Sequence, residues 1–303
     1  MSSPLALDVA DLSKKYGDRM ALSHANFEVP MGSICGFVGP NGSGKTTTIR
    51  MLLGLITPTT GSGHVLGESI TQPEKYLPRV GAMIEGPAFY PALSGIENLK
   101  VLAKIGGIPF SRCQELLDLV GLGDRGKDKY KTYSLGMKQR LGIAAALLPD
   151  PKLLILDEPT NGLDPAGIQE VRDLLEKLAD GGVTVFVSSH LLSELEMFAK
   201  YLVVLRKGKV LFAGEMQDLL HRNKPTIIAK PSSINSLNYL AELINKTGHT
   251  AVIEKDHIRV TADESFAIQL NKIAFEGGVV LAQLTPERAS LEETFMEMTE
   301  EEK

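Results

Sequence analysis

The sequence predicts an α/β fold built around a largely parallel sheet, followed by a small α+β domain. Two short apolar runs, 153–156 and 183–187, are typical of strands buried on both faces. Residues 167–179 between them carry apolar side chains at helical spacing, and the order strand, helix, strand favours a parallel sheet. Beyond residue 225 the order becomes strand, helix, strand, strand, helix, strand, which is typical of a split βαβ domain.

The remaining elements of the first domain follow from local patterns. Residues 5–29 alternate short β-like runs with turns and predict a small antiparallel sheet, which leads into a buried strand at 34–38. Residues 70–126 have a helical pattern with Gly- and Pro-rich joints, and residues 203–212 predict a closing hairpin. We therefore expect a mixed sheet core, an antiparallel β subdomain and a helical subdomain.

A change in composition near residues 222–225 predicts a linker, which divides the chain into domains 1–222 and 223–303. Ser290 and Glu293 form a capping-box pattern that predicts a further helix near the end. The second domain shows no catalytic constellation, so we expect it to serve regulation or dimer support. Its predicted strands are 226–230, 250–254, 257–261 and 278–284, and its predicted helices are 234–247 and 264–275.

The composition indicates a globular protein of the reducing cytosol. The 303 residues carry a formal net charge of −5 without a dense Lys/Arg block, so nucleic acid is not an expected partner. The two cysteines are far apart, and Cys35 lies in the strand pattern at 34–38, which predicts a core residue. No run reaches the roughly 18 apolar residues of a membrane span, and no secretory signal is visible. Any membrane role must therefore come through a partner.

A phosphate-loop motif follows the strand at 34–38 directly. It fits the pattern G-x-x-x-x-G-K-[ST] and precedes a helical stretch, so backbone N–H groups and the positive end of a helix would face a polyphosphate. Lys45 can reach the β- and γ-phosphates, and the Thr46 hydroxyl can ligate Mg²⁺. The flanking strand and helix disfavour the alternative of a glycine-rich turn with a stray lysine. The predicted nucleotide-binding residues are Gly39, Pro40, Asn41, Gly42, Ser43, Gly44, Lys45, Thr46 and Thr47.

Two acidic residues end the buried run at 153–156. Asp157 is placed to hold the Mg²⁺ shell, and Glu158 to polarise a water for attack on the γ-phosphate. Strand-end acids also cap helices, but the phosphate loop in the same chain favours the catalytic interpretation. A lone histidine is more often structural, yet His190 follows the next strand and so belongs at the same sheet edge. The candidate catalytic residues are Glu158, His190 and Lys45.

Residues 133–140 open a helix, with Ser134 as its natural N-cap and Gly136 allowing close backbone approach. An ordinary helix start explains this segment equally well by itself. Together with its surroundings, however, it resembles the nucleotide-binding domain of ATP-binding-cassette (ABC) proteins. The resemblance covers residues 5 to about 220 and rests on five motifs in order: the phosphate loop, 133–137, 156–159, 161–164 and His190.

The resemblance implies a head-to-tail homodimer that encloses two ATP molecules. Ser134 and Gly136 of one subunit would face the γ-phosphate held by the loop of the other, and Asp164 would lie at the dimer seam. Tyr16 matches the aromatic residue that stacks on adenine in this family, with a simple turn tyrosine as the alternative. Lys45 and Thr46 would keep the phosphate and Mg²⁺ roles already given.

The chain departs from the family pattern in two places. Leu135 and Met137 replace the third and fifth residues of the usual Leu-Ser-Gly-Gly-Gln signature, and Glu85 stands where most members carry glutamine. A carboxylate at this position can ligate Mg²⁺, but it cannot donate a hydrogen bond when ionised. The segment from Glu85 to about residue 100 and the tail at 291–297 resemble the bacitracin-resistance and lantibiotic-immunity type of ABC exporter ATPase.

Residues 86–100 also fit a docking surface for a membrane subunit. Phe89, Tyr90 and Leu93, held by Pro87 and Pro91, would form an apolar cleft for a short helix, with loop packing onto the helical subdomain as the alternative.

The sequence therefore predicts an ATP-hydrolysing subunit on the cytoplasmic face of a membrane that drives export through a separate permease. The resemblance suggests a peptide antibiotic or a lipid-like compound as the cargo. The alternative is a soluble or regulatory ABC ATPase that remodels a protein assembly. A kinase or GTPase is disfavoured because neither explains the motifs at Ser134 and His190.

Overall fold

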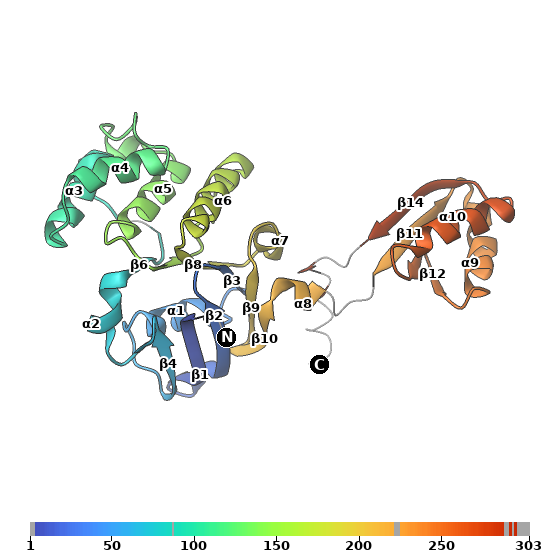
Figure 1. Cartoon of the computed structure of the whole chain (residues 1–303), viewed down its shortest axis with the longest axis horizontal. Coiled ribbons are helices and arrows are strands. Elements are labelled where there is room, and N and C mark those ends of the chain that lie inside the picture. Colours follow the sequence, from blue (N-terminus) through green and yellow to red (C-terminus); the bar gives the residue numbers. More distant parts are fainter. Residues whose placement is uncertain (1–3, 87, 221–224, 288–290, 293, 296–303) are drawn as a thin grey trace. The chain divides into compact units, whose positions relative to one another are not determined.

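The computed structural model describes residues 4–86, 88–220, 225–287, 291–292 and 294–295. The chain divides into two compact units, Met1–Met216 and Gln217–Lys303 (Figure 1). Pro87, most of the predicted linker and the predicted capping box at Ser290 and Glu293 lie outside the described residues.

A six-stranded sheet in the order β10-β9-β3-β8-β7-β6 forms the centre of the first unit. Every residue of β3, β7 and β8 is buried, as expected for strands with layers on both faces. Only β10 runs antiparallel to its neighbour, β9, so the sheet is mixed and the predicted closing hairpin is confirmed. The strands are β3 (Ile34–Val38), β6 (Val80–Met83), β7 (Leu153–Asp157), β8 (Thr184–Ser189), β9 (Tyr201–Arg206) and β10 (Lys209–Glu215).

Strand β6 corrects the prediction of a helical pattern throughout residues 70–126. Val80 lies opposite Leu153, and the strand pairs in parallel with β7 at the sheet edge. A Cβ at Gly81 would lie 2.1 Å from the carbonyl oxygen of Ala146, at the end of helix α5 (Leu135–Ala146). Glycine thus lets the helix backbone approach the strand. The strand is only four residues long, too short for its periodicity to appear in the sequence.

A second, antiparallel sheet in the order β2-β1-β4-β5 confirms the predicted β subdomain. Its apolar side chains share one core with the central sheet: the ring centroids of Phe27 and Phe37 lie 6.1 Å apart, and those of Phe37 and Phe186 lie 5.0 Å apart. The strands are β1 (Leu5–Tyr16), β2 (Arg19–Pro30), β4 (Thr60–Val65) and β5 (Glu68–Ser69).

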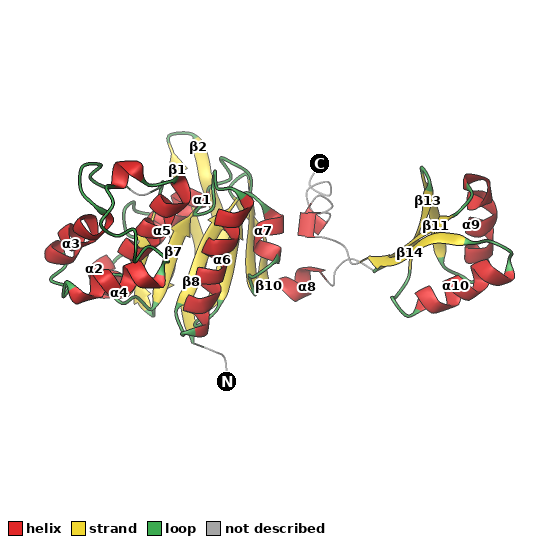
Figure 2. Ribbon diagram, turned by 90° about the horizontal axis from the view of Figure 1, so that it is seen from above, coloured by secondary structure: helices red, strands yellow, loops and turns green. Residues whose placement is uncertain are grey.

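The helices of the first unit surround these sheets. Helices α3, α4 and α5 pack on one another as the helical subdomain, and α6 packs against β8 and β3 (Figure 2). Ser94 and Glu97 form a capping box at the start of α3, and its hydrogen bonds lower the pKa of Glu97. The helices are α1 (Lys45–Leu52), α2 (Pro73–Tyr76), α3 (Gly95–Ile105), α4 (Ser111–Leu119), α5, α6 (Pro165–Asp180) and α7 (Leu192–Glu196), with short 3₁₀ turns at Leu77–Arg79 and Tyr130–Thr132. Helix α8 (Met216–Leu220) begins at the last residue of this unit and continues into the second.

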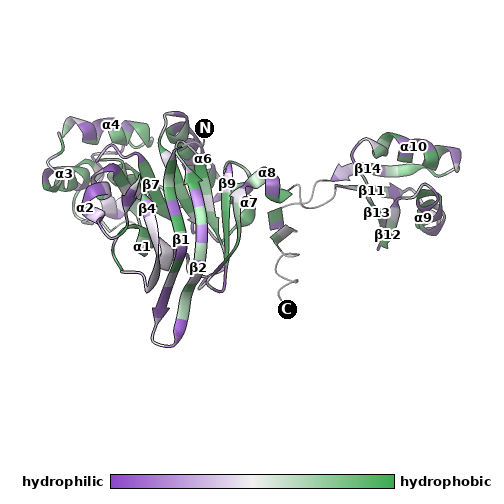
Figure 3. Ribbon diagram, turned by 60° about the horizontal axis from the view of Figure 1, so that its bottom comes forward, coloured by the Kyte–Doolittle hydropathy of each residue, from purple (hydrophilic) through white to green (hydrophobic). Residues whose placement is uncertain are grey.

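The C-terminal unit has the predicted βαββαβ order. Its antiparallel sheet is ordered β12-β13-β11-β14, and α9 and α10 pack on one face around Ile227, Leu240 and Leu270. Figure 3 shows hydrophilic and hydrophobic residues mixed along α10, as in a helix with one buried face. The last strand begins three residues later than predicted because Gly278, at φ +74°, turns the chain first. The elements are β11 (Thr226–Pro231), a 3₁₀ turn at Ile234–Ser236, α9 (Leu237–Asn245), β12 (Thr250–Glu254), β13 (His257–Thr261), α10 (Phe266–Glu276) and β14 (Leu281–Glu287).

Cys35 and Cys113 are both free and buried, so Cys35 is a core residue as predicted. Burial raises the pKa of both thiols. Across the described ranges, we find no helix with the length and apolarity that crossing a bilayer requires.

Candidate functional site

The phosphate loop connects β3 to α1, and two of its glycines have no room for a side chain. A Cβ at Gly39 would lie 2.1 Å from the carbonyl oxygen of Leu205, and one at Gly44 would lie 2.4 Å from that of Ala21. Gly44 also has φ +112°, which disfavours any residue with a Cβ. The loop therefore curls tightly against β2 and β9 and leads into the first turn of α1, where backbone N–H groups lack helical partners.

Lys45 joins the loop to the acidic end of β7. Its Nζ donates a hydrogen bond of 2.5 Å to the carbonyl oxygen of Gly39 and lies 3.2 Å from Oε1 of Glu158. Its side chain is only 6% exposed, and a buried ammonium needs such partners. Ser43, in the same loop, has a buried hydroxyl without a hydrogen-bond partner among the described residues. The loop thus holds one buried cation and one unused hydroxyl donor.

Thr46 and Asp157 meet at the start of α1. The Thr46 Oγ1 donates to Oδ2 of Asp157 at 2.8 Å, and the Ser188 Oγ donates to Oδ1 of the same carboxylate at 2.5 Å. A hydroxyl beside a carboxylate is a hard oxygen donor set, which suits Mg²⁺. In the described part of the chain, no three His, Cys, Asp or Glu side chains form a metal-binding cluster. Thr46 and Asp157 are thus the oxygen donors that the structure brings together at this point.

Glu85 lies in an ion pair with Arg50, whose guanidinium approaches the Glu85 Oε1. Arg50 is four residues after Thr46 on α1, so the two share one face of the helix. The predicted metal role of Glu85 thus involves a carboxylate that is 63% exposed and already paired. Sequence reasoning did not anticipate Arg50 as its partner.

Glu158 and His190 meet across two neighbouring strands. The His190 Nδ1 lies 2.7 Å from Oε2 of Glu158. The Glu158 backbone N–H donates to the Ser188 Oγ at 3.0 Å, and Glu158 adopts φ +51°, an unusual value for a non-glycine residue. Glu158 and His190 therefore meet at the carboxyl edge of the sheet, where the sequence predicted each of them, and the Glu158 backbone is in a constrained conformation.

Most of the predicted nucleotide-binding residues line a cavity of about 550 Å³. Tyr16 lies at this cavity, half-exposed, with the Lys14 Nζ 5.1 Å from its ring centroid. Arg19 and Ala21 of β2 also line it and were not predicted, although the hairpin pairs Arg19 with Tyr16. The lining residues are Tyr16, Arg19, Ala21, Asn41, Gly42, Gly44, Lys45, Thr46, Thr47 and Glu158. Pro40 contributes to the loop turn, where its carbonyl oxygen accepts from the Ser43 N–H at 3.1 Å.

The structure does not bring Ser134 and Gly136 to this cavity within one chain. Ser134 caps α5, with its Oγ accepting from the Met137 N–H at 3.3 Å. A Cβ at Gly136 would lie 3.8 Å from the Leu163 side chain. Asp164 caps α6 and accepts from the Gly167 N–H at 2.9 Å. The role of these residues toward a second subunit stays a prediction.

The predicted docking segment packs partly onto the helical subdomain. The ring of Phe89 meets that of Tyr130 edge-on at 5.3 Å, whereas Tyr90 is 63% exposed. The Asn98 side chain accepts from the Tyr90 N–H at 2.8 Å and fixes the loop on α3. One aromatic residue of the segment therefore serves packing, and another remains available at the surface.

Residues 22–161 match the protein family described as ABC transporter. The "Bacitracin transport ATP-binding protein BcrA" of Bacillus licheniformis is 42% identical over 295 residues, which cover 96% of each chain. This chain belongs to the ABC transporter family. It is therefore an ATP-binding-cassette ATPase, as the motifs predicted.

A second relative and one solved structure match mainly the cassette's length. The "Lantibiotic transport ATP-binding protein SrtF" of Streptococcus pyogenes is 44% identical over 209 residues, covering 69% of this chain and 90% of SrtF. A dimeric ATP-binding cassette in a post-hydrolysis state, bound to ADP and Pi, is 25% identical with a TM-score of 0.61. It covers 69% of this chain and 98% of its own. Both confirm the nucleotide-binding fold.

Proposed function

We propose that this ABC protein hydrolyses ATP to drive export through a separate membrane permease. The observation that carries the proposal is the meeting of Lys45, Asp157, Glu158 and His190 at one sheet edge. BcrA and SrtF, both named as transport ATP-binding proteins, support the transport assignment. The cassette supplies the energy in this assignment, and the permease supplies the pathway.

Nucleotide would bind along the cavity from Tyr16 to the phosphate loop. The Tyr16 ring would stack on adenine, while loop N–H groups and Lys45 hold the phosphates. Lys45 is held by Glu158 and the Gly39 carbonyl, so an entering γ-phosphate would exchange one anionic partner of the ammonium for another. That exchange would release Glu158 to polarise the attacking water.

His190 would orient Glu158 and contact the γ-phosphate. The contact of 2.7 Å between Nδ1 and Oε2 supports this role, because it fixes the carboxylate rotamer at the sheet edge. The residues also fit a Mg²⁺ ion, with Thr46 and Asp157 as direct or water-mediated ligands and Glu85 as a further acidic group. When bound, Mg²⁺ would neutralise charge on the phosphates.

We further propose that two copies close head to tail around ATP. Ser134 and Gly136 are remote from the cavity of their own chain, which is expected if they act on nucleotide held by the other subunit. Asp164 would then lie at the seam. The dimeric state of the ADP-bound cassette supports this arrangement.

The proposed place of the protein is the cytoplasmic face of the cell membrane, attached through its permease. The exposed Tyr90 beside Phe89 and Leu93 would receive a short permease helix. A peptide antibiotic is the favoured cargo, because BcrA and SrtF are named for bacitracin and lantibiotic transport. A lipid-like compound would use the same machinery.

Affinity purification of the tagged chain from its native membranes in mild detergent tests the transport assignment. We expect a stoichiometric polytopic membrane protein to accompany it and ATP hydrolysis by the purified complex. A Tyr90→Ala variant should reduce recovery of the permease while ATP binding is kept. Recovery of the wild type only from the soluble fraction, alone or with a cytosolic assembly, would replace transport with protein remodelling.

A further inference from the structure

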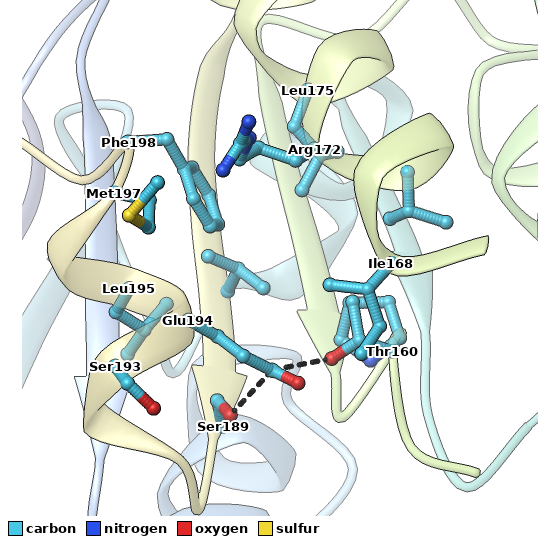
Figure 4. Close-up of a pocket in the computed structure, with 13 residues that line it drawn as sticks. Thr160, Ile168, Arg172, Leu175, Ser189, Ser193, Glu194, Leu195, Met197 and Phe198 are labelled. Carbon is cyan, nitrogen blue, oxygen red and sulfur yellow. Dashed lines mark hydrogen bonds between the residues drawn. The ribbon is translucent and has the colours of Figure 1, made fainter. Parts of the chain in front are cut away.

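A pocket of about 220 Å³ lies between α6, β8 and α7 and is lined in part by Thr160 and Ser189, which are close in sequence to Glu158 and His190 (Figure 4). Its walls are mostly apolar, with Ile168 and Leu175 from α6 and Leu195 and Phe198 from the α7 region. Glu194 of α7 points across it toward Thr160 and Ser189. A carboxylate in such surroundings needs hydrogen-bond donors, and these two residues provide them.

Glu194 bonds to the loop that carries Glu158 and to the end of β8, directly before His190. Its Oε2 accepts from the Thr160 Oγ1 at 2.8 Å and from the Ser189 Oγ at 3.2 Å. An ionised carboxylate only accepts hydrogen bonds, so both hydroxyls must donate to it. Thr160 is two residues after Glu158, and Ser189 is the residue before His190. One oxygen therefore connects the loop after β7 to the end of β8.

The bonds continue from Glu194 around His190. Because the Ser189 hydroxyl donates to Glu194, its lone pairs are free to accept from the Leu191 N–H at 3.0 Å. The residues on both sides of His190 are thus tied to one hydroxyl. Such a chain of hydrogen bonds fixes direction as well as distance.

The turn after Glu158 is held in the same way. The Glu158 carbonyl accepts from the Asn161 N–H at 3.2 Å, and the Thr160 carbonyl accepts from the Leu163 N–H at 3.1 Å. These bonds make residues 158–163 a compact turn, so an anchor on the Thr160 side chain restrains the Glu158 backbone as well. Ser188 restrains the same loop from the nucleotide side, through its 3.0 Å bond to the Glu158 N–H.

We propose that Glu194 is a positioning residue for ATP hydrolysis. It holds the loop after β7 and the loop after β8 in one register, so that the His190 Nδ1 stays within hydrogen-bond distance of Glu158. Glu194 itself does not line the nucleotide cavity. This inference rests on the proposed catalytic roles of Glu158 and His190. Because small displacements of reacting groups cost on the order of 100-fold in rate, its removal should act on turnover.

Two substitutions at Glu194 separate positioning from folding. Glu194→Ala removes the acceptor of both hydroxyls, and we expect kcat for ATP hydrolysis to fall about 10- to 100-fold with KM for ATP within about 3-fold. Glu194→Gln retains an acceptor oxygen and should recover kcat to within about 3-fold of the wild type. Ser193→Ala, which removes an exposed hydroxyl from the same helix, is the matched control and should leave kcat unchanged.

A double-mutant cycle with Thr160→Val tests the connection itself. If both residues act through one hydrogen bond, Glu194→Ala combined with Thr160→Val should be no slower than the slower single variant. Multiplicative losses would overturn the shared pathway. Nucleotide binding and thermal unfolding are measured on every variant, and a Glu194→Ala protein that binds ATP and unfolds like the wild type while turning over normally would overturn the proposal.

The outcomes also separate this inference from the proposed function. A wild-type complex without ATPase activity, or a Glu158→Gln variant with full activity, would contradict the catalytic assignment itself. Normal dependence on Glu158 together with a fully active Glu194→Ala variant would contradict only the positioning role. Loss of kcat in both the Ala and the Gln variant, accompanied by a lower melting temperature, would assign Glu194 to stability.

Discussion

The two units of the chain use their charged side chains differently. In the cassette, Lys45, Asp157 and Glu158 gather at one sheet edge beside a cavity. In the C-terminal unit, charged side chains of β11, β13 and β14 pair with one another or with residues of β12 and the β12–β13 turn. Arg259 lies 3.1 Å from Glu254 and 3.3 Å from Glu287. The candidate reacting groups therefore lie in the first unit. The charged side chains of the second unit pair with other residues of that unit.

Asp256 illustrates this internal pairing. The hydrogen bond from Lys230 is the main cause that lowers the pKa of the Asp256 carboxyl to about 2, and a hydrogen bond with His257 adds to it.

The match to SrtF agrees with this comparison of the two units, because the 209 aligned residues make up 90% of SrtF. A relative named for transport thus has little length for a second unit. The comparison places the candidate reacting groups in the cassette, and a role of the C-terminal unit in regulation or dimer support stays a prediction.

The largest effect is expected for Glu158→Gln. Removing the general base should lower ATPase about 100- to 10,000-fold while ATP binding persists, and ATP-bound dimers should accumulate. Steady-state hydrolysis and size-exclusion chromatography with ATP measure both. The matched control is Glu254→Gln in the C-terminal unit, which should keep full activity. An equal loss of ATPase activity in the two variants would contradict the conclusion that the reacting groups lie in the cassette alone.

Lys45→Ala should act on binding rather than on turnover alone. Lys45 is the buried cation at the phosphate loop, and losing a charge-assisted hydrogen bond to phosphate should weaken ATP affinity by about 10-fold or more. Fluorescent-nucleotide titration measures this change, with Lys177→Ala, at an exposed position near the end of α6, as the control. Unchanged affinity together with lost turnover would restrict the lysine to the transition state.

Leu240→Ala tests whether the C-terminal unit can be weakened without harming catalysis. Leu240 is fully buried in that unit's core, so the change should lower the free energy of unfolding of the unit by about 2–5 kcal/mol. ATPase below the unit's melting temperature should stay within about twofold. Tyr239→Ala, at the half-exposed neighbouring position, is the control. A strong loss of ATPase would show that the reaction depends on the second unit.

Glu85→Gln should have the smallest effect. The change breaks the ion pair with Arg50 and removes one negative charge near the predicted Mg²⁺ site, so half-maximal ATPase should require about threefold more Mg²⁺. A Mg²⁺ titration measures it, with Glu68→Gln as a control because Glu68 pairs with Arg79 at 3.9 Å. An unchanged titration would show that Glu85 serves only Arg50.

Local patterns were sufficient to predict most of the fold. The phosphate loop, the buried strands β7 and β8, the Ser134 cap and the βαββαβ order each depend on contiguous residues, and the structure has all of them. Strand β6 was missed because four residues around Gly81 show no period, and its strand character comes from pairing with β7. The pairing with β7, which is distant in the sequence, therefore determines that residues 80–83 form a strand.

The same distinction holds for the site. Asp157, Glu158 and His190 were predicted because residues at the ends of parallel strands must lie at one edge. Arg19, Arg50 and Glu194 were not predicted, because each reaches its place through a hairpin register or a helix face rather than through a motif. The neighbours that orient a catalytic group are set by tertiary packing, which a motif does not encode.

The burial of both cysteines gives the protein a practical property. Cys35 and Cys113 are the only thiols in the sequence, and both are enclosed and held in the protonated form. A thiol-reactive probe would therefore find no site on the native surface. One cysteine introduced at the exposed Leu135, next to Ser134, would take a spin label or fluorophore selectively. If two subunits pair as proposed, the distance between two such labels would shorten when ATP is added and lengthen again as it is consumed.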